Sequence, residues 1–91
     1  MSFDASQVYQ PAEDTFLLIR AALAEVRPGD TVVEIGTGSG AVASAVQKAA
    51  PRTIGVDINP HAVAYAHAVN GVETVRSDLF SAVSGKFDLI L

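Results

Sequence analysis

Cysteine is absent from this 91-residue sequence and basic residues are scarce, with 6 Lys or Arg against 10 Asp or Glu. Without cysteine the chain has no disulfide framework, no thiolate metal site and no cysteine nucleophile. Its two histidines, His61 and His67, are six positions apart on an expected helix, whereas two metal ligands on one helix face need a spacing of three or four. A net charge of −4 without any basic run argues against direct binding of phosphate backbones.

Long apolar segments are also lacking. No apolar run approaches the roughly 20 residues of a membrane-spanning helix, and residues 1–10 lack the apolar core of a secretory signal. We therefore expect a cytoplasmic protein without a membrane partner. The length allows a single small domain over residues 1–91.

Hydrophobic residues make up 49% of the sequence and fall into alternating helical and strand-like segments. Phe16, Ile19, Leu23 and Val26 recur at spacings of three and four, which predicts one apolar helix face. Helices are expected over residues 11–26, 41–50 and 60–69. Strands are expected over residues 31–35, 53–57, 72–76 and 86–91. This alternation predicts an α/β fold with a parallel sheet, right-handed crossovers and helices on both faces.

Residues suited to ligand binding follow the ends of the predicted strands. The segment Glu34–Gly40 follows the first strand, Asp57 ends the second and Asp78 follows the third. In open parallel sheets a ligand binds beyond the carboxyl ends of the strands, where the strand order reverses. The sequence therefore predicts a nucleotide-like ligand at this edge of the sheet.

The segment E-I-G-T-G-S-G (34–40) is a glycine-rich turn between a strand and a helix. Glycines permit a tight turn and a close approach of the backbone to a ligand, although a turn without a ligand is the simplest alternative. A dinucleotide site is a second alternative, because Gly36, Gly38 and Ala41 satisfy the pattern G-x-G-x-x-G/A. Asp57 follows at the distance of a ribose ligand, so spacing alone leaves a nicotinamide dinucleotide (NAD) open.

Charge separates NAD from S-adenosylmethionine (SAM). NAD brings a pyrophosphate, which a nearby carboxylate repels, and Glu34 stands two positions before the first glycine. SAM instead brings a sulfonium and an ammonium, which acidic residues attract. The charged residues before position 41 are Asp4, Glu13, Asp14, Glu25, Asp30 and Glu34, against Arg20 and Arg27. The local excess of acid therefore favours SAM.

Two aspartates have roles in such a site. Asp57 could accept hydrogen bonds from both ribose hydroxyls, and its alternative role is a solvated cap of the following helix. Asp78 could accept from the adenine amino group, with Leu79 or Phe80 against the ring. The alternative for Asp78 is an ordinary turn aspartate.

The sequence resembles the HemK-related methylases in five segments. These are V-Y-Q-P-A-E-D-T-F-L-L (8–18), E-I-G-T-G-S-G-A-V (34–42), D-I-N-P-H-A-V (57–63), S-D-L-F (77–80) and K-F-D-L-I-L (86–91). The resemblance covers nearly the whole chain and is closest to the archaeal and eukaryotic branch, which methylates a glutamine side chain of class I peptide release factors. The glycine motif is shared by many class I SAM-dependent methyltransferases, whereas the opening Y-x-P-x-E-D-T segment is much more specific.

The resemblance implies a Rossmann-like parallel sheet of strand order 3-2-1-4 with an N-terminal helix, and a set of SAM-binding residues. These residues are Thr15, Glu34, Gly36, Gly38, Asp57, Asp78 and Leu79. Glu34 and Gly36 would hold the methionine portion, and Asp57 would bind the ribose. Asp78 and Leu79 would frame the adenine.

In this family an Asn-Pro-Pro-Tyr motif follows the fourth strand, and its Asn would accept from the substrate amide. The motif is absent from the 91 residues, so no catalytic residue is assigned. We therefore expect the cofactor-binding half of a SAM-dependent methyltransferase, truncated before this motif and inactive alone. A nucleic-acid adenine N6-methyltransferase and a truncated or engineered half-domain without catalysis are the alternatives.

The resemblance also implies partners. A peptide release factor would be the protein substrate, and a small zinc-binding activator subunit accompanies many members of this branch. With the strand order 3-2-1-4, the apolar segment Lys86–Leu91 would be an unpaired edge of the sheet, which predicts self-association through that strand.

Overall fold

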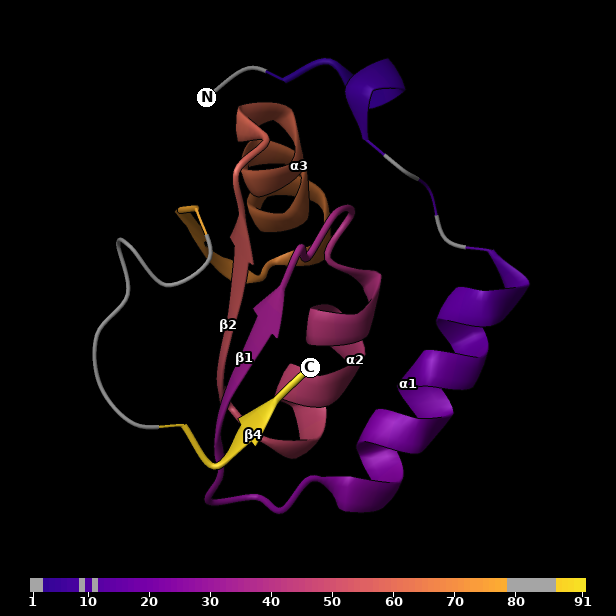
Figure 1. The fold of residues 1–91 in the computed structure, drawn as a ribbon, viewed down its shortest axis with the longest axis vertical. Helices are drawn as coiled ribbons and strands as arrows, with labels where there is room; N and C mark the ends of the chain where they lie inside the picture. Colours follow the sequence, from indigo (N-terminus) through magenta and orange to yellow (C-terminus); the bar gives the residue numbers. More distant parts are fainter. Residues whose placement is uncertain (1–2, 9, 11, 79–86) are drawn as a thin grey trace.

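A parallel four-stranded sheet with the strand order β3-β2-β1-β4 lies at the centre of the molecule (Figure 1). The computed structural model describes residues 3–8, 10, 12–78 and 87–91. The strands are β1 (Thr31–Ile35), β2 (Arg52–Asp57), β3 (Glu73–Arg76) and β4 (Leu89–Ile90). The predicted Rossmann-like order is confirmed, and β1 has the predicted bounds because its run of β-branched residues suits a strand buried within a sheet.

Three α-helices and one short 3-10 helix accompany the sheet. They are η1 (Ala5–Gln7), α1 (Glu13–Glu25), α2 (Ala41–Ala49) and α3 (Pro60–Asn70). At the start of α3, the Asn59 side chain accepts a hydrogen bond from the His61 N–H at 2.9 Å, and Gly71 ends the helix with a φ of 66°. Pro11, expected in the first turn of α1, lies outside the described residues. None of the described helices is both long and apolar enough to cross a lipid bilayer.

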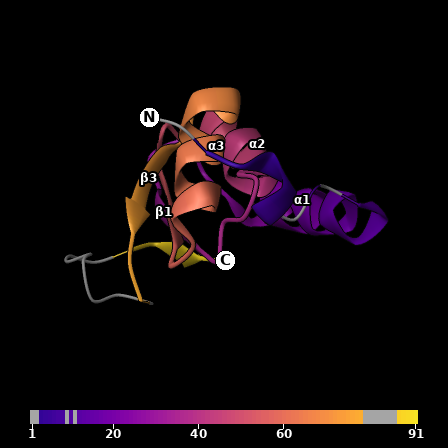
Figure 2. The same ribbon diagram turned by 90° about the horizontal axis from the view of Figure 1, so that it is seen from above.

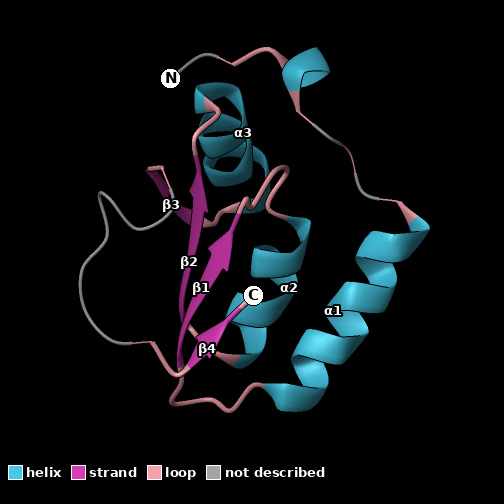
Figure 3. Cartoon of the chain, in the orientation of Figure 1, coloured by secondary structure: helices cyan, strands magenta, loops and turns pink. Residues whose placement is uncertain are grey.

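The three α-helices lie on one face of the sheet (Figure 2). This arrangement follows from chain direction: β1 to β2 and β2 to β3 are successive parallel steps towards the same edge, and right-handed crossovers then place α2 and α3 on the same side. Helix α1 packs beside α2 (Figure 3). The expectation of helices on both faces is therefore not met within the described part of the chain.

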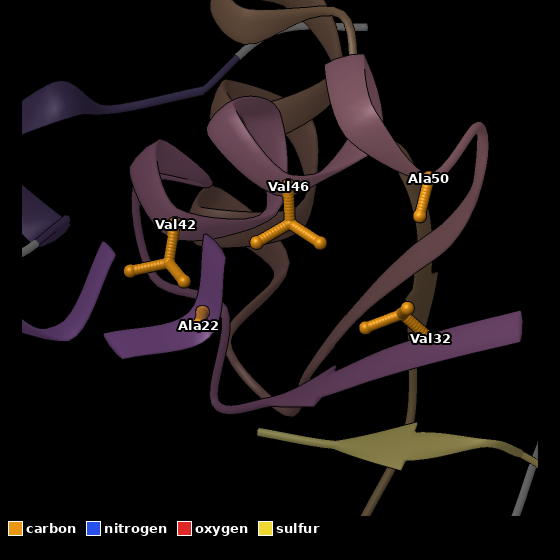
Figure 4. Packing of buried hydrophobic residues seen from close by; sticks show 5 residues of the cluster. All are labelled: Ala22, Val32, Val42, Val46 and Ala50. Atoms are coloured by element: carbon orange, nitrogen blue, oxygen red, sulfur yellow. The ribbon is translucent and has the colours of Figure 1, made fainter. Parts of the chain in front are cut away.

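The core lies between β1 and the helices. Val32 of β1 points towards Val46 and Ala50 at α2, and Ala22 of α1 closes the cluster from the side (Figure 4). Each of these four residues is at most 3% exposed. Small side chains predominate, so the layers pack closely around a modest apolar volume.

The predicted apolar face of α1 is only partly correct. Ile19 and Val26 pack against the core as expected, but Phe16 and Leu23 are 58% and 42% exposed. The buried line instead passes through Ala22, whose spacing from Ile19 and Val26 is also three and four. Because Ala22 is small, α1 approaches α2 along this line, and the two larger residues lie at its outer border.

Strand β4 joins the sheet beside β1, pairing Leu89 with Val32 and Ile90 with Val33. The pairing is anchored before the strand, where the Asp88 carboxylate accepts from the Thr31 N–H at 2.8 Å. The outer edge of β4 has no strand partner among the described residues. Ile90, on the face opposite the helices, is 57% exposed.

Candidate cofactor site

The glycine-rich turn after β1 takes a backbone path that favours glycine at alternate positions. Gly36, Gly38 and Gly40 have φ values of 69°, 57° and 83°, in the left-handed region that residues with a side chain rarely adopt. Gly40 has a second constraint, since a Cβ there would lie 2.6 Å from the Cβ of Ala66 on α3. The glycine spacing is therefore a requirement of this turn and of its contact with α3.

The turn is held from both sides. The Thr37 N–H donates to the Val56 carbonyl of β2 at 2.8 Å. The Asn70 side-chain amide at the end of α3 donates to the Ser39 carbonyl at 2.7 Å. Within the turn, the Gly40 N–H also donates to the Thr37 carbonyl at 2.9 Å. Together these bonds fix the backbone of the turn, so the site is preorganised.

A pocket of about 420 Å³ opens beside this turn, at the carboxyl ends of β1 and β2. That volume is within the range of small-molecule sites. Its lining residues come from the segment around η1, from α1, the ends of β1 and β2, the turn, α2 and the start of α3. They are Gln7, Val8, Asp14, Thr15, Leu18, Glu34, Gly36, Thr37, Gly38, Ser39, Ala41, Val42, Asp57, Asn59 and Ala62. A pocket therefore lies where the sheet topology predicts that a ligand binds.

Most of the sequence-predicted site residues meet in this pocket. The pocket is lined by Thr15 of α1, Glu34 of β1, Gly36 and Gly38 of the turn, and Asp57 of β2. Asp78 is described, is exposed, and is not among the lining residues. The position of Leu79 lies outside the described residues.

Asp57 connects the two elements that border the pocket. One carboxylate oxygen accepts from the Gly38 N–H at 2.9 Å, across 19 positions of sequence, and the other accepts from the Asn59 N–H at 2.9 Å. A carboxylate has about four acceptor positions, so two remain for a ligand's hydroxyl groups. Asp57 thus contributes to the start of α3, the expected alternative, while its side chain also faces the pocket.

Glu34 is the most unusual ionisable group of the site. Its side chain is 6% exposed, and its carboxylate accepts from the Thr37 hydroxyl at 2.6 Å. The pKa of Glu34 is raised from 4.5 to about 7: burial is the largest cause and the charge of Asp57 adds to it, whereas hydrogen bonds from the Thr37 hydroxyl and the Ala43 N–H partly offset the rise. Near neutral pH this carboxyl group therefore changes charge readily.

The pocket has an acidic lining. Asp14, Glu34 and Asp57 contribute carboxylates, and no Lys or Arg is present among the described lining residues. Such a lining suits a ligand with cationic groups and disfavours a pyrophosphate. Across the described part of the chain, no group of three or more His, Cys, Asp or Glu could hold a metal ion.

Sequence reasoning missed some of the lining residues. Gln7 and Val8 come from the lead-in segment, and the Asn59 side-chain amide donates to the Gln7 carbonyl at 2.8 Å, so this segment is tied to the start of α3. Thr37 stands between two glycines, and the sequence pattern alone indicates only its place in the turn. The available signal was that a β-branched residue is disfavoured in a flexible turn unless its side chain has a specific contact.

Known proteins of similar sequence show the family to which this chain belongs. The family described as methyltransferase domain matches residues 8–91, which is nearly the whole chain. The chain belongs to this methyltransferase family. A candidate protein N5-glutamine methyltransferase from Methanocaldococcus jannaschii is 45% identical over 93% of this chain, and methyltransferase HEMK2 of Mus musculus is 34% identical over 92%. The predicted resemblance to HemK-related methylases is thereby confirmed.

Solved structures show the same fold. The ribosomal protein L11 methylase of Lactobacillus delbrueckii subsp. bulgaricus superposes on 97% of this chain with a TM-score of 0.76 and 32% identity, and this chain covers 49% of that protein. The chain also spans only 45% and 46% of the lengths of the Methanocaldococcus and mouse relatives. This methyltransferase domain thus corresponds to about half of each of these relatives.

Membership of the family implies the use of SAM as methyl donor, and the residues present fit it. The acidic lining suits the sulfonium and ammonium groups of SAM. The pocket volume and the constrained glycine turn suit close contact between backbone and ligand.

Proposed function

We propose that this chain is the cofactor-binding half of a methyltransferase that modifies a protein glutamine side-chain amide, with a peptide release factor as substrate. The proposal rests on one observation: Thr15, from the specific opening segment, lines the same pocket as Glu34 and Asp57. The 45% identity to the candidate N5-glutamine methyltransferase supports the choice of glutamine.

The methionine and ribose portions of SAM have suitable counterparts in the pocket. Glu34, in its charged form, would attract the ammonium of the methionine portion, with Gly36 lying against the same portion. Asp57 would accept from the ribose hydroxyls through the acceptor positions that Gly38 and Asn59 leave free. Asp78 and Leu79 remain predicted adenine contacts on the evidence of the sequence motif.

Bound SAM would supply an electrophilic methyl group on a sulfonium. The contribution of this chain would be to fix the methionine and ribose portions so that the methyl group is presented in one orientation. The Asn-Pro-Pro-Tyr motif that would orient the amide acceptor does not occur in the 91 residues. We therefore propose that the chain alone transfers no methyl group to a release factor.

Calorimetric titration with S-adenosylhomocysteine tests the cofactor assignment, with NAD as the comparison ligand. We expect binding of the first ligand only, and at least a tenfold loss of affinity in an Asp57→Ala variant, which corresponds to one charge-assisted hydrogen bond. Glu25→Ala is the charge-matched control, because Glu25 is an exposed carboxylate at the end of α1 and does not line the pocket. Binding of NAD in preference would overturn the assignment.

The acceptor is tested with a chimera in which this chain replaces the corresponding part of the Methanocaldococcus relative. We expect the chimera to transfer a labelled methyl group from SAM to a glutamine of a class I release factor. Ribosomal protein L11 is the comparison acceptor, since L11 methyltransferases also match this chain. A chimera that binds S-adenosylhomocysteine but methylates only L11 would contradict the proposed substrate.

Two protein partners belong to the same proposal. A small zinc-binding activator subunit would associate with the complete enzyme, and co-purification with the chimera is its test. Self-association of this chain would use the outer edge of β4, where Ile90 is exposed and no described strand pairs.

A further inference from the structure

Thr37 is a buried polar residue at the centre of the glycine turn, 5% exposed. Its N–H is fixed to the Val56 carbonyl, and its hydroxyl donates to Glu34 Oε1 at 2.6 Å. Both ends of the residue are thus committed, one to the backbone of β2 and the other to a carboxylate that lines the pocket. A change in the geometry of the Thr37–Glu34 hydrogen bond would therefore alter the contacts of a ligand bound in the pocket.

Strand β2 leaves room for this side chain. Gly55 pairs in register with Glu34, and a Cβ at position 55 would lie 2.6 Å from the Thr37 hydroxyl oxygen and 2.9 Å from its Cβ. Glycine within a strand weakens it, and often marks a close approach of another group. Here that approaching group is the Thr37 side chain, so Gly55, Thr37 and Glu34 form one packed unit.

We propose that Thr37 is a positioning residue for the cofactor: its hydroxyl holds the Glu34 carboxylate towards the pocket in the charged form that attracts a cationic ligand group. The part of this inference that concerns SAM rests on the proposed function. The part that concerns Glu34 depends only on this chain.

The groups around Glu34 make its ionisation depend on the Thr37 hydroxyl. Asp57 of β2 and Asp14 of α1 are the other carboxylates that line the pocket, and no described basic residue lines it. Burial and Asp57 favour the neutral form of Glu34, and only the Thr37 hydroxyl and the Ala43 N–H at the start of α2 oppose them by lowering its pKa. Removing one of two opposing hydrogen bonds therefore favours protonation.

The first experiment follows the Glu34 side-chain carboxyl by carbon-13 NMR in the free chain, between pH 4 and 9. In Thr37→Val, which keeps the volume and removes the hydroxyl, we expect the titration midpoint to rise by roughly one pH unit. Thr37→Ser keeps the hydroxyl and is expected to restore the wild-type midpoint. An unchanged midpoint in Thr37→Val overturns the proposal.

A second measurement needs no substitution. If the hydroxyl is bonded to the carboxylate, the Thr37 Cβ resonance of the wild-type chain follows the Glu34 midpoint. A Thr37 resonance that is insensitive to pH over this range refutes the contact, even if Thr37→Val does not fold.

The second experiment titrates wild type, Thr37→Val and Thr37→Ser with S-adenosylhomocysteine at pH 7 and pH 9. A midpoint raised by one unit reduces the ionised fraction of Glu34 about fivefold at pH 7 but little at pH 9, so the affinity loss in Thr37→Val should follow this pattern. A loss of equal size at both pH values would show a purely structural role and overturn the positioning role. Absence of binding by wild type would refute the cofactor assignment while leaving the NMR result intact.

Discussion

Replacing Glu34 by Gln should make this protein more stable at alkaline pH while weakening cofactor binding. The pKa of Glu34 is raised from 4.5 to about 7, mainly by burial, so folding favours its protonated form. The stabilising contribution of that form is complete below pH 4.5 and is lost as the pH rises through about 7. At 1.36 kcal/mol per pH unit, the loss is roughly 3 kcal/mol.

Urea denaturation followed by circular dichroism, at pH 4.5 and pH 8, measures the effect. Glutamine keeps the shape and the acceptor for the Thr37 hydroxyl but has no charge to bury. The free energy of unfolding of Glu34→Gln, relative to wild type, should therefore rise by about 3 kcal/mol between the two pH values.

Glu73→Gln is the matched control, because Glu73 is an exposed glutamate on β3 and the exchange alters the formal charge equally. The reasoning is refuted if the difference between Glu34→Gln and wild type is the same at both pH values. It is also refuted if the Glu73 variant shows the same gain. A gain in stability accompanied by lost affinity would indicate that the site retains a buried charge for binding at the expense of stability.

Four further substitutions test the turn, the ends of α3 and the edge of the sheet. Gly40→Ala should cost about 3 kcal/mol of unfolding free energy, from its positive φ and its 2.6 Å approach to Ala66, whereas Gly71→Ala, with a similar φ in open space, should cost only about 1 kcal/mol by chemical denaturation. Asn59→Ala should lower stability by about 1 kcal/mol in the same assay, since it removes the cap of α3; no change would show that the cap contributes nothing. Ile90→Lys should reduce concentration-dependent association in sedimentation velocity; an unchanged distribution would exclude the β4 edge as the contact.

Local rules predicted the elements of this fold well. The β-branched run of β1 and the Asn-Pro and Asn-Gly pairs around α3 gave their bounds to within a residue, because the causes are local: strand propensity, a side-chain cap and a left-handed glycine. The strand order required the family resemblance, since the sheet pairs segments far apart in the sequence.

Tertiary contacts explain what the sequence alone did not predict. The buried face of α1 is centred on Ala22 rather than on Phe16 and Leu23, because a small residue lets the helices pack closely. The contact between Thr37 and Glu34 depends on the space above Gly55, which is a property of a neighbouring strand. Periodicity and spacing cannot show such contacts, whereas they do show where the glycines and Asp57 stand.

The pairing of β1 with β4 has a consequence for how the chain folds as it is synthesised. Thr31 and Asp88, which are hydrogen bonded, are separated by 57 positions, so one flank of β1 has no strand partner until Asp88 and the residues of β4 have been synthesised. The β1-α2-β2-α3-β3 unit can form earlier, but until β4 pairs with it the apolar flank of β1 is exposed to solvent. At about 5–20 residues per second of translation, the 12 positions from Arg76 to Asp88 (88 − 76) take on the order of a second.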